Sequence, residues 1–327
     1  MSRRRTWGWS EEHIAAVVFV LLAVVPLVTG GYLVYVLPQY MLYGVLAMSL
    51  VLIWGFAGIL SFGQAAFFAV GAYTIGLALS HGGPMDPTYA GLLGAVVVGG
   101  ALAAACGYFL FSAGVRDMYF VLVTLALSIM TEQIANSQSQ ITGGFNGMFV
   151  KRISLALPGG RLLPLNGDAA MYFFVLAVVV IVYFVLRRLR LGRFGKILIG
   201  IRENEDRAIS LGYRTYLYKT AAFALSGALA ALAGALYASD AGFVSPSLGS
   251  VEFSTEVVVW VALGGRGSLI GGLLGAMVVA AASNLLSAII PDYWELAVGI
   301  VFILVILFFK GGVAGALAQL ARRREEA

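Results

Sequence analysis

The sequence is poor in the residues that carry chemistry. Its 327 residues include one cysteine and two histidines, which leaves no pair for a disulfide and too few ligands for a metal cluster. Charged residues make up only 11% of the chain, too few to cover a water-facing surface. The segment 192–197, GRFGKI, lacks the spacing and the hydroxyl of a phosphate-binding loop. We therefore expect no metal site, no bound cofactor and no ATP hydrolysis by this chain.

Hydrophobic residues make up 61% of the chain and gather in long runs separated by short polar segments. Most runs reach the roughly 17–25 residues that a tilted helix needs to cross the hydrocarbon. They predict an all-α, polytopic membrane protein with about ten transmembrane helices, although 252–263 is too short to cross alone. The predicted spans are 14–31, 34–54, 60–80, 89–113, 117–135, 169–186, 216–238, 252–263, 269–290 and 293–309.

The basic residues predict the orientation, because Lys and Arg beside a span resist translocation. With the amino terminus inside and ten passes, the cytoplasmic side receives every Lys and Arg except Lys151, Arg152 and Arg161. Membrane orientation explains this distribution better than nucleic-acid binding does. The first span lacks a small-residue cleavage site, which favours a retained helix over a signal peptide. The resulting divisions are a cytoplasmic tail over 1–13, a transmembrane domain over 14–310, a cytoplasmic loop over 187–215, an external loop over 136–168 and a cytoplasmic tail over 311–327.

The central loop is the one long polar stretch of the chain. Residues 187–219 hold nine basic side chains and three acidic ones, and the middle of the stretch predicts a short helix that Gly212 ends. A structured loop of this kind predicts a docking surface for a partner. A solvated basic loop that only sets topology is the alternative. The apolar face expected on the helix consists of Ile201, Ala208, Ile209 and Leu211.

Two glycine-interrupted segments, 55–73 and 262–276, stand at comparable places in the two halves of the chain. Broken helix is tolerated in a membrane only within protein or beside a water-filled cavity. The pair therefore predicts two inverted-repeat-like halves with a translocation pathway at their interface. Close helix packing at the GxxxG pattern is the equally weighted alternative. The candidate pathway residues are Gly58, Ser61, Gly63, Gln64, Phe67, Gly264, Gly265 and Gly267.

Three smaller features complete the pattern. The span 216–238 repeats small residues every fourth position, which predicts close helix contact. Glu132 is the one acid well inside a proposed span, near its outer end. The external loop begins with a glycine-rich turn. This turn could contact solute or a binding protein, and the alternative is that it only reverses the chain. Its candidate residues are Thr142, Gly143, Gly144 and Asn146.

Five segments together resemble the LivM-type permease subunit of ABC importers for branched-chain amino acids. They are LIWGFAGILSFGQAAFFAVGAYT (52–74), ITGGFNGM (141–148), 199–238, LGGRGSLIGGLLGA (263–276) and VFILVILFFKGGVAGAL (301–317). The resemblance implies a multi-pass subunit of a bacterial inner membrane that translocates branched-chain amino acids, or else urea or short-chain amides. It implies no enzyme activity.

The resemblance also implies partners. These are a homologous LivH-type permease, two cytoplasmic ATPase subunits that use ATP and Mg, a solute-binding protein and membrane lipids, with no nucleic acid. The central loop would then couple to the ATPase, since Asp206-Arg207-Ala208 stands where that loop's Glu-Ala-Ala motif is expected. The trailing Ile-x-Leu-Pro of the motif is absent. The coupling residues implied are Arg202, Glu203, Asp206, Arg207, Ala208 and Gly212.

A passive channel or an ion-coupled carrier acting alone is a competing hypothesis. Ion coupling is disfavoured because no Lys, Arg or His lies in the middle of a proposed span. A membrane enzyme is disfavoured because the spans bring no acid–base or nucleophile pair within reach.

Overall fold

Helices make up nearly all of the computed structural model, which describes residues 7–81, 86–115, 117–156, 162–164, 167–289, 296 and 299. Its elements are α1 (Trp7–Val28), α2 (Tyr32–Leu50), η1 (Val51–Ala57), α3 (Gln64–His81), α4 (Pro87–Ser112), α5 (Asp117–Ser137), α6 (Ser139–Thr142), η2 (Gly144–Asn146), β1 (Met148–Phe149), β2 (Ser154–Ala156), β3 (Leu162–Pro164), α7 (Asp168–Leu191), α8 (Arg193–Glu203), α9 (Glu205–Ser210), α10 (Thr215–Ala241), β4 (Phe243–Val244), η3 (Pro246–Gly249), α11 (Val251–Gly264) and α12 (Leu269–Ile289).

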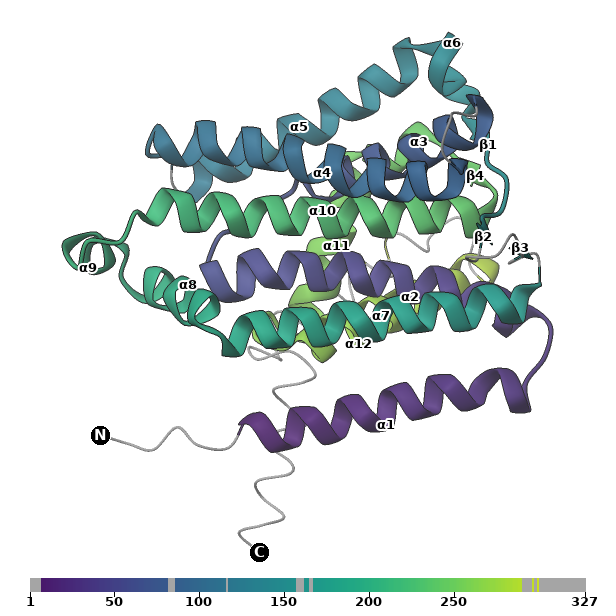
Figure 1. Ribbon diagram of the computed structural model, residues 1–327, viewed down its shortest axis with the longest axis horizontal. Coiled ribbons are helices and arrows are strands. Elements are labelled where there is room, and N and C mark those ends of the chain that lie inside the picture. The colour runs from purple at the N-terminus through teal and green to yellow at the C-terminus, as the bar shows by residue number, and fades with distance from the viewer. Residues whose placement is uncertain are drawn as a thin grey trace, which may run out of the picture.

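The long helices lie side by side along one axis, with α8 and α9 at one end of the bundle and the strands at the other (Figure 1). We call these the α8–α9 end and the strand end. Within the described residues, seven helical segments are long and apolar enough to cross a membrane. The prediction of a polytopic, helical membrane protein is therefore confirmed. The predicted span 293–309 falls outside the described residues, apart from 296 and 299, so the count of ten stays a prediction.

The core lies where α10 packs against α3 and α4. A side chain at Gly234 of α10 would collide with the carbonyl oxygen of Phe68, and one at Gly71 of α3 would collide with the carbonyl oxygen of Ala231. Gly99 of α4 faces Ala231 as closely. The predicted small-residue face of this helix is thus a packing surface, where backbones approach and dispersion replaces the hydrophobic effect.

Two short antiparallel ribbons cover the strand end. Strand β1 pairs with β4, placing Met148 opposite Val244, and β2 pairs with β3. The amide of Ile153 donates to Ser239 Oγ at 2.9 Å, which ties the long loop after α5 to the last turn of α10. The loop is therefore anchored over the bundle rather than free of it.

Helix α1 lies at the edge of the bundle (Figure 1). Glu11 holds its amino end, because Oε2 pairs with Arg190 of α7 at 3.0 Å and Oε1 accepts from Ser268 Oγ at 2.8 Å and from the amide of Leu269 at 3.2 Å. One carboxylate thus joins α1 and α7 to the first turn of α12. Its bonds satisfy an α12 amide that has no partner within its own helix.

Candidate functional site

The polar central loop forms two helices that are fixed to the bundle. Asn204 separates α8 from α9, and its side chain accepts from the amide of Arg207 at 2.8 Å as the cap of α9. Glu205 pairs with Lys219 of α10 at 2.6 Å, and both side chains are mostly buried. Gly212 follows α9 with φ of 87°, and its amide donates to the carbonyl of Ile209 at 2.9 Å. The predicted short helix and its glycine end are confirmed.

Some apolar side chains of the central loop pack against the bundle, and others are exposed to solvent. Ile201 and Ala208 are buried against the bundle, whereas Ile209 is 48% exposed and Leu211 is 71% exposed. The expected single apolar face is therefore split into two faces. Of the coupling residues implied by the resemblance, Ala208 points inward, and the exposed ones are Arg202, Glu203, Asp206, Arg207 and Gly212.

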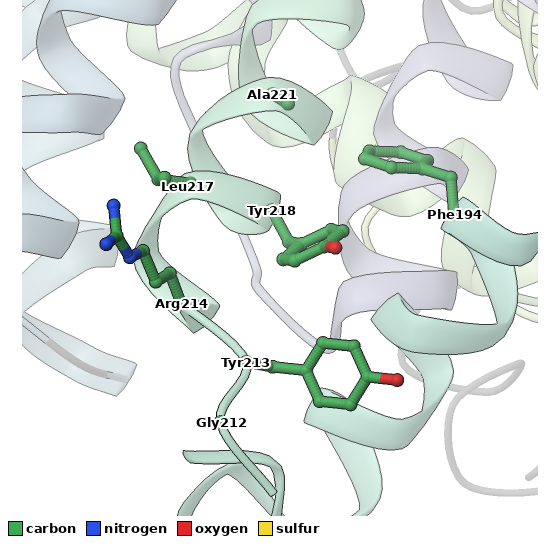
Figure 2. Close-up of a pocket in the computed structure, with 7 residues that line it drawn as sticks. All are labelled: Phe194, Gly212, Tyr213, Arg214, Leu217, Tyr218 and Ala221. Carbon is green, nitrogen blue, oxygen red and sulfur yellow. The ribbon is translucent and has the colours of Figure 1, made fainter.

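An aromatic groove of about 430 Å³ lies beside α9, where the turn after Gly212 meets α8 and α10. Figure 2 shows its lining, which consists of Phe194, Gly212, Tyr213, Arg214, Leu217, Tyr218 and Ala221. The ring of Tyr218 lies 6.1 Å from the rings of both Tyr213 and Phe194, centroid to centroid. Sequence reasoning missed this groove, although the aromatic run YRTYLY directly after the glycine marks it.

The first predicted interruption begins as a π-helical segment, η1, that ends at Gly58 with φ of 77°. Arg202 of α8 reaches it, because Nη1 donates to the carbonyl oxygen of Gly55 at 2.5 Å and Nη2 pairs with Glu203 at 2.7 Å. The stem of Arg202 also fills the space beside Gly58, where an added Cβ would lie 2.6 Å from its Cγ. A residue implied in coupling thus contacts the broken segment directly.

The second predicted interruption, 262–276, contacts the first one at Gly55. A side chain at Gly55 would collide with the carbonyl oxygen of Arg266, which lies in the turn between α11 and α12. Within that turn Gly264 packs against Gly271, Gly265 has φ of 99°, and the Cβ position of Gly267 meets no atom within 4 Å in the described residues. Residues 264–268 therefore form a tight hairpin turn, and Gly264 serves close packing.

Residues 58–63 form irregular backbone that starts at the exposed Gly58 and enters the bundle, where Ser61 and Gly63 are buried. The amide of Phe62 donates to Thr124 Oγ1 at 3.1 Å, and its carbonyl accepts from Ser128 Oγ at 2.7 Å. Ser61 Oγ accepts from the amide of Gly63 at 3.1 Å. Hydroxyl groups of α5 thus replace the helical bonds that this segment lacks, as a membrane interior requires.

The next candidate residues begin α3 and are buried. Gln64 accepts from Ser49 Oγ at 3.0 Å and donates to Ser226 Oγ at 3.2 Å, which joins α2, α3 and α10. The ring of Phe67 meets Phe223 edge to face with centroids 5.4 Å apart. Gln64 and Phe67 therefore lie in a closed core within this chain.

A second interior interruption, which sequence reasoning missed, precedes α11. Residues 242–250 turn back into the bundle, where Gly249 lies against Thr131 and the backbone of Glu132. Ser254 Oγ then lies 2.9 Å from Ser128 Oγ. Ser128 of α5 therefore contacts both the first interruption, at Phe62, and the helix that follows the second, at Ser254. The glycine, proline and serine cluster GFVSPSLGS was the available signal.

The short helices after these interruptions run in opposite directions. Helix α3 begins inside the bundle and reaches the strand end, where Gly76 meets Met148. Helix α11 begins inside the bundle and reaches the α8–α9 end, where the following turn meets Gly55. Helices α3 and α11, which follow residues 58–63 and 242–250, therefore run in opposite directions along the bundle. The relation predicted between 55–73 and 262–276 stays a prediction.

The external-loop candidates form a tight turn. Gly143 and Gly144 both have positive φ, and a side chain at Gly143 would collide with the carbonyl oxygen of Gly147. The buried Thr142 hydroxyl donates to the carbonyl of Ala135 at 2.6 Å. Asn146 is exposed, and so are the neighbouring rings of Phe145 and Phe149, which are 84% and 85% exposed.

Comparison with known proteins gives a family match over most of the chain. The family model described as branched-chain amino acid transport system / permease component matches residues 32–306. The high-affinity branched-chain amino acid transport system permease protein LivM of Escherichia coli (strain K12) is 29% identical, over 93% of this chain and 75% of that protein. LivM of Salmonella typhimurium is also 29% identical, over 84% of this chain and 68% of that protein.

A third relative matches a smaller part of the chain. The autoinducer 2 import system permease protein LsrC of Escherichia coli O9:H4 is 31% identical over 46% of this chain and 45% of that protein. No solved structure matches the chain.

Proposed function

The chain belongs to the family of branched-chain amino acid transport system permease components, and we propose that it is one permease subunit of an ATP-driven importer. It is a transport subunit and not an enzyme. In this proposal a solute-binding protein delivers solute outside the cell, two ATPase subunits bind inside, and a second, LivH-type permease completes the pathway.

The contact of Arg202 with Gly55 carries the proposal. Helices α8 and α9 project from the bundle (Figure 1), yet Arg202 joins α8 to the backbone at the π-helical segment. A partner that displaces α8 therefore displaces η1 and the turn at Arg266 with it. Such a connection lets a cytoplasmic motor favour one arrangement of the pathway over another, which is what alternating access needs.

The docking surface consists of the exposed part of this projection. Leu211 and Ile209 offer apolar area, Asp206 and Arg207 offer charges of both signs, and the aromatic groove of Figure 2 lies beside them. Apolar contact at the centre with charges around it suits a protein interface. We assign this surface to the ATPase subunit.

The proposed orientation puts the α8–α9 end in the cytoplasm of a bacterial cell, at its inner membrane. The described basic residues lie at that end, except for Lys151 and Arg152 in the loop at the strand end. This distribution favours retention of the α8–α9 end inside. Both termini would be cytoplasmic, and the exposed Phe145 and Phe149 would face the solute-binding protein.

Branched-chain amino acids are the proposed solute, because both LivM relatives align with most of this chain. Urea and short amides are the alternative within the same importer type. The partial likeness to LsrC adds a further solute class to be tested.

Reconstitution tests the function. We expect proteoliposomes that contain both permeases and the ATPase subunits to accumulate radiolabelled leucine only with ATP and the loaded binding protein. Omission of the ATPase subunits is the control. Uptake that persists without them would favour a passive channel, and preferential uptake of urea or an amide would replace the proposed solute.

A further inference from the structure

A cluster of aromatic side chains lies where α2, α3, α10 and α11 meet. Tyr43 of α2 stacks on Tyr237 of α10 with ring centroids 5.2 Å apart. It also lies 5.0 Å from Trp260 and 5.6 Å from Phe253, both of α11. Phe68 of α3 closes the back of the group, 5.4 Å from both Tyr237 and Phe253. We call these five side chains the aromatic cluster.

Three of the five rings in the aromatic cluster are partly accessible. Trp260 and Phe68 are fully buried, whereas Tyr43, Tyr237 and Phe253 are each partly exposed. Trp260 Nε1 is buried and has no hydrogen-bond partner in the described part of the chain. An indole N–H normally finds a partner when it is buried, so the cluster contains an unused donor next to open ring surface.

Two carboxylates flank these rings. Asp240, one helical turn beyond Tyr237, is 3% exposed, and its Oδ2 has no hydrogen-bond partner among the residues described. Gln39 donates to the Asp240 carboxylate, and Arg152 acts on it electrostatically. Glu256, one turn beyond Phe253, acts electrostatically on Tyr43. The aromatic cluster therefore has two acidic groups beside it, and one of them, Asp240, also lies near the positive charge of Arg152.

The same face of α11 is too polar for lipid. Glu252 and Thr255 are exposed there, and Glu256 is half-buried, within the part of the helix that starts inside the bundle. Acidic side chains at this depth face a water-filled cavity or another subunit, because hydrocarbon penalises them. The aromatic cluster thus opens onto the side where a second permease and a pathway would lie.

We propose that the aromatic cluster, with Asp240 and Glu256, binds the solute in transit: the carboxylates hold its ammonium group and the open rings hold its apolar side chain. The faces of Tyr and Trp attract cations, and their area suits an aliphatic side chain. An apolar amino acid offers both groups, whereas urea offers neither and a short amide offers an alkyl group without an ammonium. This inference rests on the proposed function and assigns the solute site within it.

Leucine binding by the assembled transporter tests the site. The complex of both permeases and the ATPase subunits in nanodiscs is titrated with radiolabelled leucine, without the solute-binding protein. We expect Asp240→Asn to weaken binding about tenfold, and Asp240→Glu, which keeps the charge, to restore most of it. Tyr43→Ala should weaken binding as well, with Tyr119→Ala as its control, since Tyr119 is 75% exposed near the start of α5 and is not part of the aromatic cluster.

Competition on the unmodified complex gives a result that needs no variant. Isopentylamine, which keeps the ammonium group, should displace leucine, whereas isocaproate, which keeps the carboxylate, should not. Displacement by isocaproate alone, wild-type binding by Asp240→Asn, or no displaceable leucine binding at all would each overturn the site. Recovery of the ATPase subunits in the same samples reports separately on the proposed function.

Discussion

Arg202 and Gly55 are 147 positions apart in the chain, yet the guanidinium of one donates to the carbonyl oxygen of the other at 2.5 Å. This bond crosses from the projecting α8 to the π-helical end of the second long helix. In a π-helix each bond joins residues five apart, so the last carbonyls of the segment have no partner within it. The side-chain donor of Arg202 supplies one and stabilises the end of the segment. The hydrogen bond joins α8 to the bundle, so that a displacement of α8 is passed on to η1.

Removal of the Arg202 guanidinium should separate docking from transport. We expect Arg202→Ala to retain the ATPase subunits on purification but to lower ATP-driven leucine uptake at least about tenfold, because a charged hydrogen bond worth about 1.5–3 kcal/mol is lost. Arg193→Ala, at the exposed start of the same helix, is the control. Equal uptake by both variants would contradict the coupling role of Arg202.

A side chain at Gly212 should weaken the docking surface through the backbone alone. The position has φ of 87°, and an added Cβ meets no described atom within 4 Å, so the penalty is conformational. We expect Gly212→Val to cost about 1–2 kcal/mol locally and to reduce co-purification of the ATPase. Gly200→Ala, with equally open surroundings inside α8, should leave recovery unchanged or improved.

Charge and apolar changes on α9 should affect the partner and not the fold. Exchange of the exposed charges as Asp206→Lys with Arg207→Glu, or loss of apolar area in Leu211→Ser, should each reduce recovery of the ATPase complex. Expression and thermal stability of the permease should stay at the wild-type level. Full recovery of the complex with both variants would refute the docking assignment.

The hydroxyl of Ser128 should contribute more to stability than its size suggests. It donates to the carbonyl of Phe62 and lies 2.9 Å from Ser254 Oγ, so Ser128→Ala leaves buried polar groups of two segments without a partner. We expect a loss of about 1–3 kcal/mol in unfolding free energy, seen as a lower melting temperature in detergent. Ser137→Ala, whose hydroxyl bonds only within its own exposed turn, is the control.

Accessibility to a membrane-impermeant thiol reagent tests the proposed orientation. With the natural thiol removed by Cys106→Ala, Phe149→Cys should react in intact cells and Leu211→Cys only after lysis, because both positions are well exposed at opposite ends. Reaction of Leu211→Cys in intact cells would reverse the membrane sidedness and with it the docking proposal.

Hydrophobic run length predicted the helices well, and the structure explains where it failed. Runs such as 169–186 were predictable because backbone in hydrocarbon must pair its polar groups within a helix, whatever the rest of the fold. The break at 242–250 was missed because the residues it packs against, Thr131 and Glu132 of α5, are far away in sequence. The glycines of 262–276 suggested a broken helix beside a pathway, whereas in the structure they allow close contact between backbones.

The candidate sites divide in the same way. Gly212 was predictable because a helix end has a local signal in the sequence. The burial of Gln64 and Phe67 was not, because it depends on the neighbouring Ser226 and Phe223 of another helix. The acids of α11 were overlooked because that run looked too short to span, although a short helix that starts inside the bundle places such groups deep in it.

The carboxylate of Glu11 has a consequence for biogenesis. The chain is synthesised from its amino end, and Arg190 is 179 positions and Leu269 258 positions beyond Glu11, so the bond to Arg190 can form long before the bond to Leu269. Helix α1 can therefore pack against α7 first, and its link to α12 is completed only when the last of these helices has been made.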